Sequence, residues 1–176
     1  MHGGGSLWWR VLRAHAYAVL VIGVFLGALP WFVVQVVSGV PLKPSVDWPF
    51  SASGYLGLLL AATGGALSYA CMLLFVIRGK GTAFPTDPPL VFVPGGPYRC
   101  VRNPMYLGNA VLAIGIGLYL SSVPYLLYTG ALMVAMNFYV AAIEEPRLAE
   151  RFGASYEMYR RSTPRWIPRP PRSPLP

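Results

Sequence analysis

Residues 103–143 read NPMYLGNAVLAIGIGLYLSSVPYLLYTGALMVAMNFYVAAI, a run of 41 residues without one charged side chain. A helix needs about 20 residues to cross the hydrocarbon core of a bilayer, which is about 30 Å thick. The run is therefore long enough for two crossings, and the sequence Ser-Ser-Val-Pro at 121–124 interrupts it near the middle. We predict a helical hairpin with spans at 105–120 and 123–143.

Two further stretches without charge precede the hairpin, at 16–37 and 54–77, and each fits one crossing. The predicted fold is therefore an all-α integral membrane bundle of about four transmembrane helices, in a single domain over residues 1–176. The first stretch could instead be a secretory signal peptide. It is longer than the usual apolar region of about 7–15 residues, and no small-residue cleavage site follows it, so we interpret it as a span.

The composition supports a membrane protein. Apolar residues make up 55% of the chain and charged residues 11%, whereas about 25% of an ordinary soluble domain is charged. So few charges cannot cover a soluble surface, and a disordered chain would be less apolar. Both classes are excluded.

The basic residues predict the orientation in the membrane. The net charge is +8, and of the 14 Lys and Arg residues only Lys43 lies between the first two spans. If both termini are cytoplasmic, the other 13 face the cytoplasm, as the positive-inside rule requires. We therefore expect a multi-pass protein of the prokaryotic inner membrane or the plasma membrane. Its partner is the lipid bilayer rather than a nucleic acid.

Small residues recur at four-residue spacing in the first two spans, at Gly23 and Gly27 and at Gly57, Ala61 and Gly65. Such stripes let helix backbones approach closely. We favour packing within the bundle over homodimerisation, and the oligomeric state stays open. The spans carry no ionisable group of the kind that ion-coupled transporters and voltage sensors use.

Two cytoplasmic segments contain more polar and aromatic groups than simple loops require. Residues 78–103 are dense in Pro and Gly around the apolar run Leu90–Val93, which favours an ordered pocket wall over a flexible linker. Segment 144–168 opens with Glu144-Glu145-Pro146. One reading makes the two carboxylates markers of the membrane boundary, paired with Arg147 or Arg151. The other makes one of them a ligand group, and the physics alone leaves these readings equal.

Pro146 suits the first turn of a new helix. Apolar and aromatic residues then recur at three- and four-residue spacing, which predicts an amphipathic C-terminal helix. We expect the proline-rich tail 169–176 to be disordered.

Two motifs together carry a family resemblance. Residues 96–108 read GPYRCVRNPMYLG and residues 144–159 read EEPRLAERFGASYEMY. This pair resembles the isoprenylcysteine carboxyl methyltransferase and phospholipid methyltransferase superfamily. Its signature is G-x-Y-x₃-R-H-P-x-Y-x-G, then a hydrophobic hairpin, then E-E-x₂-L-x₃-F-G-x₂-Y-x₂-Y. The resemblance covers about residues 90–168.

The resemblance implies an integral membrane methyltransferase that uses S-adenosyl-L-methionine in a pocket open to the cytoplasm. It implies structural support from Glu145, and an apolar acceptor: a lipid amine, an isoprenoid-linked thiol or acid, or a small hydrophobic thiol. It assigns no catalytic residue, and we predict no metal site. The cofactor-binding positions that it implies are Leu90, Val91, Phe92, Val93, Tyr98, Asn103, Pro104, Met105, Tyr106 and Glu144.

The chain departs from the family pattern at two positions. Asn103 replaces the histidine of the first motif, and an asparagine cannot carry a proton as imidazole does. Val140 stands where the prenylcysteine enzymes have an arginine suited to the substrate carboxylate. The second departure disfavours methyl esterification of a prenylcysteine carboxylate. Both departures are the best support for the alternative, a non-enzymatic membrane assembly factor or scaffold that retains the fold.

Overall fold

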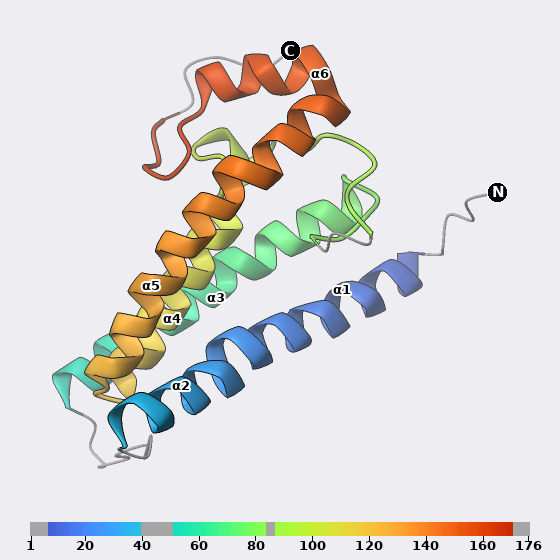
Figure 1. Ribbon diagram of the computed structural model, residues 1–176. Coiled ribbons are helices and arrows are strands. Elements are labelled where there is room, and N and C mark those ends of the chain that lie inside the picture. The colour runs from blue at the N-terminus through green and yellow to red at the C-terminus, as the bar shows by residue number, and fades with distance from the viewer. Residues whose placement is uncertain (1–6, 40–50, 84–86, 171–176) are drawn as a thin grey trace.

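A computed structural model describes residues 7–39, 51–83 and 87–170 of the chain. These residues form helices and no strands, which confirms the prediction of an all-α membrane bundle (Figure 1). The elements in chain order are α1 Leu7–Ile22, η1 Gly23–Ala28, α2 Leu29–Ser38, α3 Ala52–Ile77, η2 Gly96–Arg99, α4 Pro104–Tyr119, α5 Val123–Tyr139, η3 Val140–Glu144 and α6 Glu145–Ser162.

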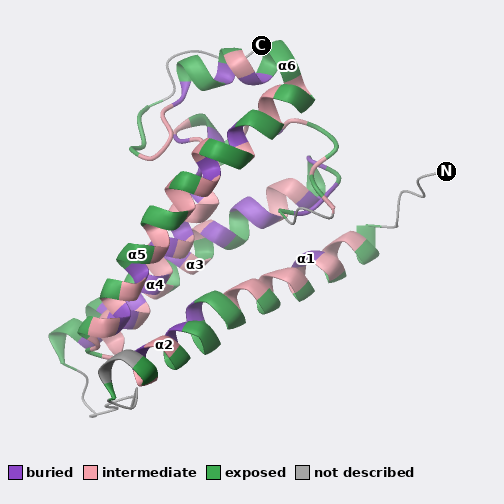
Figure 2. Ribbon diagram, in the orientation of Figure 1, coloured by how far each residue is buried: buried purple, intermediate pink, exposed green. Residues whose placement is uncertain are grey.

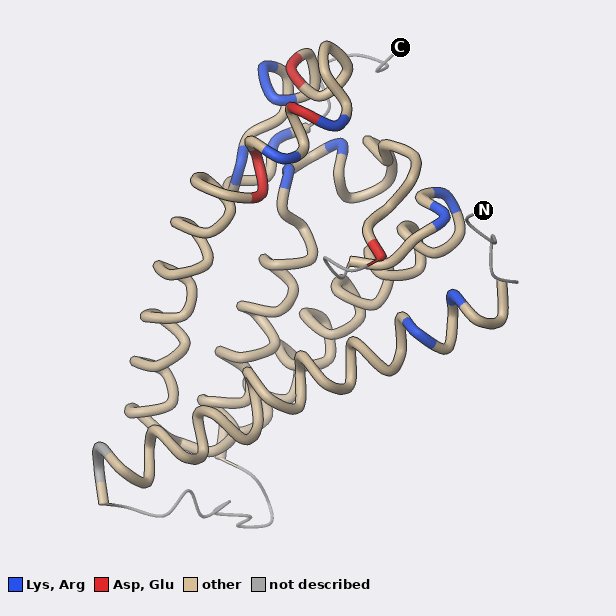
Figure 3. Tube along the Cα trace, turned by 45° about the vertical axis from the view of Figure 1, so that its right-hand side comes forward, with Lys and Arg blue, Asp and Glu red and all other residues tan. Residues whose placement is uncertain are grey.

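Three helices are long and apolar enough to cross a membrane: Leu7–Val36, Ala52–Ile77 and Val123–Ser162. The fourth apolar helix, α4, has 16 residues and is therefore only about 24 Å long at 1.5 Å per residue. Figure 3 shows the described charged residues gathered at one end of the bundle, on the start of α1, on the segment between α3 and α4, and from η3 through α6. The number of crossings and the cytoplasmic side stay predictions.

The first helix begins at Leu7 rather than at residue 16, and it continues through the π-helical turn η1 into α2. In a π turn the backbone hydrogen bonds depart from the regular α-helical pattern. Two tyrosine hydroxyls of α5 donate hydrogen bonds to carbonyls of this turn. The Tyr125 hydroxyl donates to the Leu26 carbonyl at 2.6 Å, and the Tyr128 hydroxyl donates to the Phe25 carbonyl at 2.8 Å. Both tyrosines therefore brace the first helix.

Helices α3 and α4 form the tightest contact of the bundle, along a seam of glycines. A Cβ added at Gly57 would lie 2.6 Å from the Tyr119 backbone nitrogen, and one at Gly108 would lie 2.8 Å from the Gly64 carbonyl oxygen. Figure 2 shows this seam as the buried strip between the two helices.

The predicted small-residue stripe is thus partly wrong. Gly64 rather than Gly65 faces α4, because packing on one helix face alternates four- and three-residue steps. A Cβ at Gly65, Gly23 or Gly27 would meet nothing within 4 Å.

The last helix also differs from the prediction. It runs without interruption from α5 through η3 into α6 and bends only at Gly153, whose φ of 54° and ψ of −131° are not helical. Pro146 lies in the first turn of α6, as predicted, but α6 is not a separate helix, because η3 joins it to α5. In η3 the Glu145 amide donates to the Val140 carbonyl, five residues back, and this π turn accommodates the proline. After Gly153, α6 turns across the end of the bundle (Figure 1).

The segment between α3 and α4 is ordered where the structure describes it. The amides of Leu90 and Val91 both donate to the Gly79 carbonyl, at 2.8 and 3.2 Å. Asp87 forms an ion pair with Arg13 of α1 at 3.3 Å, which ties this segment to the first helix. The predicted tail 169–176 lies outside the described residues except for 169 and 170.

Candidate functional site

Two residues of the separate motifs meet at the charged end of the bundle. The Tyr106 hydroxyl, in the first turn of α4, donates to Glu144 Oε2 at 2.8 Å. The sequence separates the pair by 38 residues, and the α4–α5 hairpin brings them together because both lie at its open end. None of the ion pairs among the described residues involves Glu144. Its carboxylate is half-buried and balanced only by a neutral hydroxyl.

The neighbouring Glu145 has the opposite environment. It is buried, with Arg102 Nη1 at 3.0 Å from its Oε1, Arg165 Nε at 2.8 Å from Oε1 and Arg165 Nη2 at 2.7 Å from Oε2. The hydrogen bonds to Glu145 raise the pKa of the Arg165 guanidinium. The reading that pairs the carboxylates with Arg147 or Arg151 does not hold for Glu145, whose partners are Arg102 and Arg165 instead. Glu145 therefore links the start of α6 to the residues just before α4 and to the residues after α6.

The residues of the run Leu90–Val93 differ in solvent exposure. Leu90 and Val91 are exposed, whereas Val93 is buried. The ring of Phe92 packs against three aromatic rings of α6, with centroid distances of 5.3 Å to Phe152, 6.0 Å to Tyr156 and 5.2 Å to Tyr159. The bend at Gly153 positions α6 for these contacts.

Tyr98 lies inside the structure. Its ring stacks on Phe75 at 5.1 Å, its hydroxyl shares a hydrogen bond with the Cys71 thiol, and burial raises its pKa well above the usual value. Its carbonyl accepts a hydrogen bond from the Tyr159 hydroxyl at 2.7 Å. Tyr98 is thus held between α3 and α6.

Asn103 binds a strap formed by residues 163–169. Its Nδ2 donates to the Arg165 carbonyl at 3.2 Å, and the Arg102 amide donates to the Pro164 carbonyl at 2.8 Å. The Trp166 indole donates to Asn137 Oδ1 on α5 at 2.8 Å. The residue in the histidine position of the motif therefore holds the C-terminal strap against the start of α4.

The remaining positions are structural neighbours of the Tyr106–Glu144 pair. Pro104 is buried at the start of α4, where a fixed φ favours helix initiation. Met105 packs with Ala14 of α1 and Met72 of α3. Val140, one turn before Glu144, is 1% exposed and fills the position of the family's arginine with an apolar side chain.

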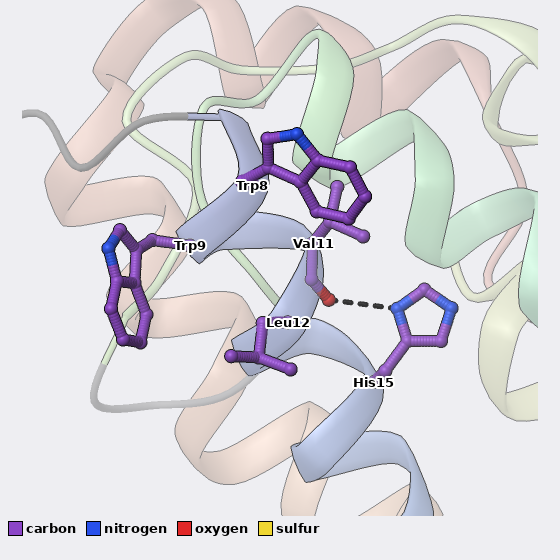
Figure 4. A pocket seen from close by; sticks show the side chains of 5 residues that line it. All are labelled: Trp8, Trp9, Val11, Leu12 and His15. Atoms are coloured by element: carbon purple, nitrogen blue, oxygen red, sulfur yellow. Dashed lines mark hydrogen bonds between the residues drawn. The ribbon is translucent and has the colours of Figure 1, made fainter.

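An apolar pocket lies elsewhere, at the start of α1. It is lined by Trp8, Trp9, Val11, Leu12 and His15, and Figure 4 shows the His15 ring turned to the Val11 carbonyl, with Nδ1 at 2.8 Å. Both tryptophans are exposed. A surface of this kind suits the membrane interface, where indole rings are enriched.

Sequence reasoning missed the strap and the arginines that neutralise Glu145. Arg102 and Arg165 belong to the stretch that resembles the family, but only the fold brings residues 102, 145 and 165 together. An unpaired charge is costly away from water, so a carboxylate beside a membrane helix could have signalled the need for arginine partners.

Comparison with protein families gives a match to the model of the phospholipid methyltransferase family over residues 52–155. The match spans α3, the segment that follows it, the α4–α5 hairpin and the first part of α6. It confirms the resemblance that the two motifs carry. No curated protein and no solved structure matches the chain.

Proposed function

The chain belongs to the phospholipid methyltransferase family, and on this premise we propose that it transfers a methyl group from S-adenosyl-L-methionine to a lipophilic or membrane-associated acceptor. The reaction takes place at the cytoplasmic face of the membrane, with both termini on that side. One observation carries the proposal: the hydrogen bond from Tyr106 to Glu144 joins the two motifs at the open end of the hairpin.

The residues present fit a cationic cofactor. Glu144 offers a half-buried carboxylate that no arginine or lysine of the described residues neutralises, and Tyr106 fixes its orientation. Away from bulk water such a carboxylate binds a cation more strongly than it does at the surface. Glu144 would therefore hold the ammonium group of the cofactor's amino-acid part, and Phe92 would form an aromatic wall.

We propose that the ten cofactor-binding positions implied by the resemblance, from Leu90 to Glu144, have three different roles. Tyr106 and Glu144 contact the cofactor. The segment Leu90–Val93 covers it, held in place by the contacts of Phe92 with α6. Tyr98, Asn103, Pro104 and Met105 keep the frame in shape through the packing and strap contacts described above.

When bound, S-adenosyl-L-methionine supplies a methyl group already activated by the sulfonium, so that the protein need not provide a nucleophile. The protein's task is to align the acceptor and exclude water. Alignment of two reactants can lower a barrier by roughly 7–11 kcal/mol.

The environment of the site favours an apolar acceptor that enters from the bilayer. Val140 offers no charge to an anionic substrate one turn from Glu144, which argues against the carboxylate of a prenylcysteine. A lipid amine or a hydrophobic thiol suits such surroundings better. The proposed location is the prokaryotic inner membrane or the plasma membrane.

The test is calorimetric binding of S-adenosylhomocysteine to the detergent-purified chain. We expect saturable binding by the wild type and at least about tenfold weaker binding by Glu144→Gln, because a charged hydrogen bond contributes roughly 1.5–3 kcal/mol. Glu157→Gln is the matched control, since Glu157 pairs with Arg160 on the outer side of α6. A folded wild type that binds no S-adenosylhomocysteine would contradict the proposal and favour a membrane scaffold.

A further inference from the structure

The segment that follows α3 exposes two large apolar side chains outside the apolar helices. Leu90 is 68% exposed and Val91 is 45% exposed. Their backbone is held in place, because both amides donate to the Gly79 carbonyl. Ile77, two residues before Gly79, is the last residue of α3 and is exposed as well. Apolar side chains that the fold gathers at the surface indicate that another molecule covers them.

Two cations flank Gly79, the residue that holds Leu90 and Val91. Arg78 and Lys80 are both exposed, and none of the ion pairs among the described residues involves either of them. The one acidic residue of the stretch 78–103 is Asp87, and Arg13 already pairs with it at 3.3 Å. The surface therefore combines apolar side chains with two cations that form no ion pair within the protein.

Two observations place this surface at the level of the lipid headgroups. Helix α3 has 26 residues and is about 39 Å long, so that it extends beyond a hydrocarbon core of about 30 Å. The Arg13–Asp87 ion pair joins the segment after α3 to the start of α1, where Trp8 and Trp9 are exposed. Indole rings are enriched at the interface between bilayer and water.

We propose that Leu90, Val91, Arg78 and Lys80 form a binding surface for an anionic phospholipid of the bilayer. The two apolar side chains lie against the acyl chains near the headgroups, and the two cations pair with the anionic headgroup. A zwitterionic headgroup has no net charge to offer, whereas each cation beside an anionic membrane surface strengthens association about fivefold. The inference rests on the membrane insertion of the helices and is independent of the proposed methyl transfer.

The experiment measures which lipid lies next to residue 90. A nitrobenzoxadiazole fluorophore is attached to Leu90→Cys in a Cys100→Ser chain, in which the other cysteine, Cys71, is buried. The full chain is placed in phosphatidylcholine nanodiscs that contain either spin-labelled phosphatidylglycerol or spin-labelled phosphatidylcholine as quencher. The same fluorophore on Ser155→Cys, an exposed position of α6, is the control for partition of the fluorophore itself.

We expect phosphatidylglycerol to quench the fluorophore at residue 90 at an about fivefold lower content than phosphatidylcholine does, with no such preference at residue 155. Replacement of Arg78 and Lys80 by Gln should abolish the preference, while both lipids still quench. Arg160→Gln with Arg161→Gln removes the same charge from α6, which turns across the end of the bundle (Figure 1), and should keep the preference. These four side chains are exposed, so the fold does not depend on them.

Equal quenching by the two lipids at residue 90 would overturn the inference, and so would an equal loss of preference in the α6 variant, because net charge alone would then explain it. The absence of quenching by either lipid would place the segment in water and overturn it as well. Loss of the preference on addition of free glycerol 3-phosphate would indicate a site for a soluble anion instead of a bilayer lipid.

Discussion

The α3–α4 seam and the charged end of the bundle are both well packed, but different forces hold them. Along the seam, Gly57, Gly64 and Gly108 bring two backbones into direct contact, and no charge is involved. At the charged end, Glu145 joins Arg102 and Arg165, so that ion pairs hold the start of α4, α6 and the strap together. Within the membrane, close backbone packing replaces the hydrophobic drive. At its edge, paired charges serve the same purpose.

The comparison teaches which charged group is not needed for the fold. Glu144 and Glu145 are adjacent, yet two arginines neutralise Glu145, whereas Glu144 accepts a hydrogen bond from a tyrosine hydroxyl and forms no ion pair with any described residue. A carboxylate that the fold does not neutralise is available to a ligand. The following substitutions test this division, from the largest expected effect to the smallest.

Gly64→Leu should break the seam. A side chain at this position would collide with the backbone of α4 at Leu112, and overpacking that neighbours cannot relieve costs about 3 kcal/mol or more. Thermal unfolding in detergent should show loss of the folded state or a large fall in Tm. Gly65→Leu is the matched control, because a Cβ there meets nothing within 4 Å, and its Tm should be unchanged or slightly higher. Equal effects of the two substitutions would contradict the close contact between the backbones of α3 and α4 at Gly64.

Glu145→Gln should destabilise the charged end. Removing one partner of a buried ion pair costs about 3–5 kcal/mol, and Arg102 is left with 11% side-chain exposure and no carboxylate. Thermal or denaturant unfolding measures the loss, with Glu144→Gln as the matched control one residue away. We expect Glu144→Gln to keep wild-type stability while it loses S-adenosylhomocysteine affinity. If the two variants unfold alike, the division between structural and ligand carboxylates is wrong.

Tyr106→Phe should have the smallest effect. It removes only the hydroxyl that orients Glu144, and one hydrogen bond is worth roughly 0.5–1.5 kcal/mol. Calorimetry should show S-adenosylhomocysteine affinity reduced about threefold to tenfold. Tyr128→Phe removes a hydroxyl that bonds the Phe25 carbonyl of η1, and it should leave that affinity unchanged. An unaltered affinity in Tyr106→Phe would mean that the tyrosine does not position the carboxylate.

The apolar helices and the two motifs could be predicted from the sequence alone. Apolar length and the absence of charge are local properties, so 54–77, 105–120 and 123–143 lie within two residues of the apolar helices at their starts. The first helix begins at Leu7, nine residues before the predicted span at 16–37, because a helix can continue beyond the apolar layer where charged side chains such as Arg10 and Arg13 reach toward water.

The packing of these helices and motifs against one another could be read from the tertiary structure but not from the sequence. Which glycine faces α4, and which of two adjacent glutamates receives the arginines, depend on helix phase and on contacts between residues far apart in the chain. The same holds for the bend at Gly153, because a π turn at η3 accommodates Pro146 and moves the break to the glycine that can adopt a positive φ. Pairing between distant segments is not written in any local pattern, and the proposed ligand role of Glu144 depends on it.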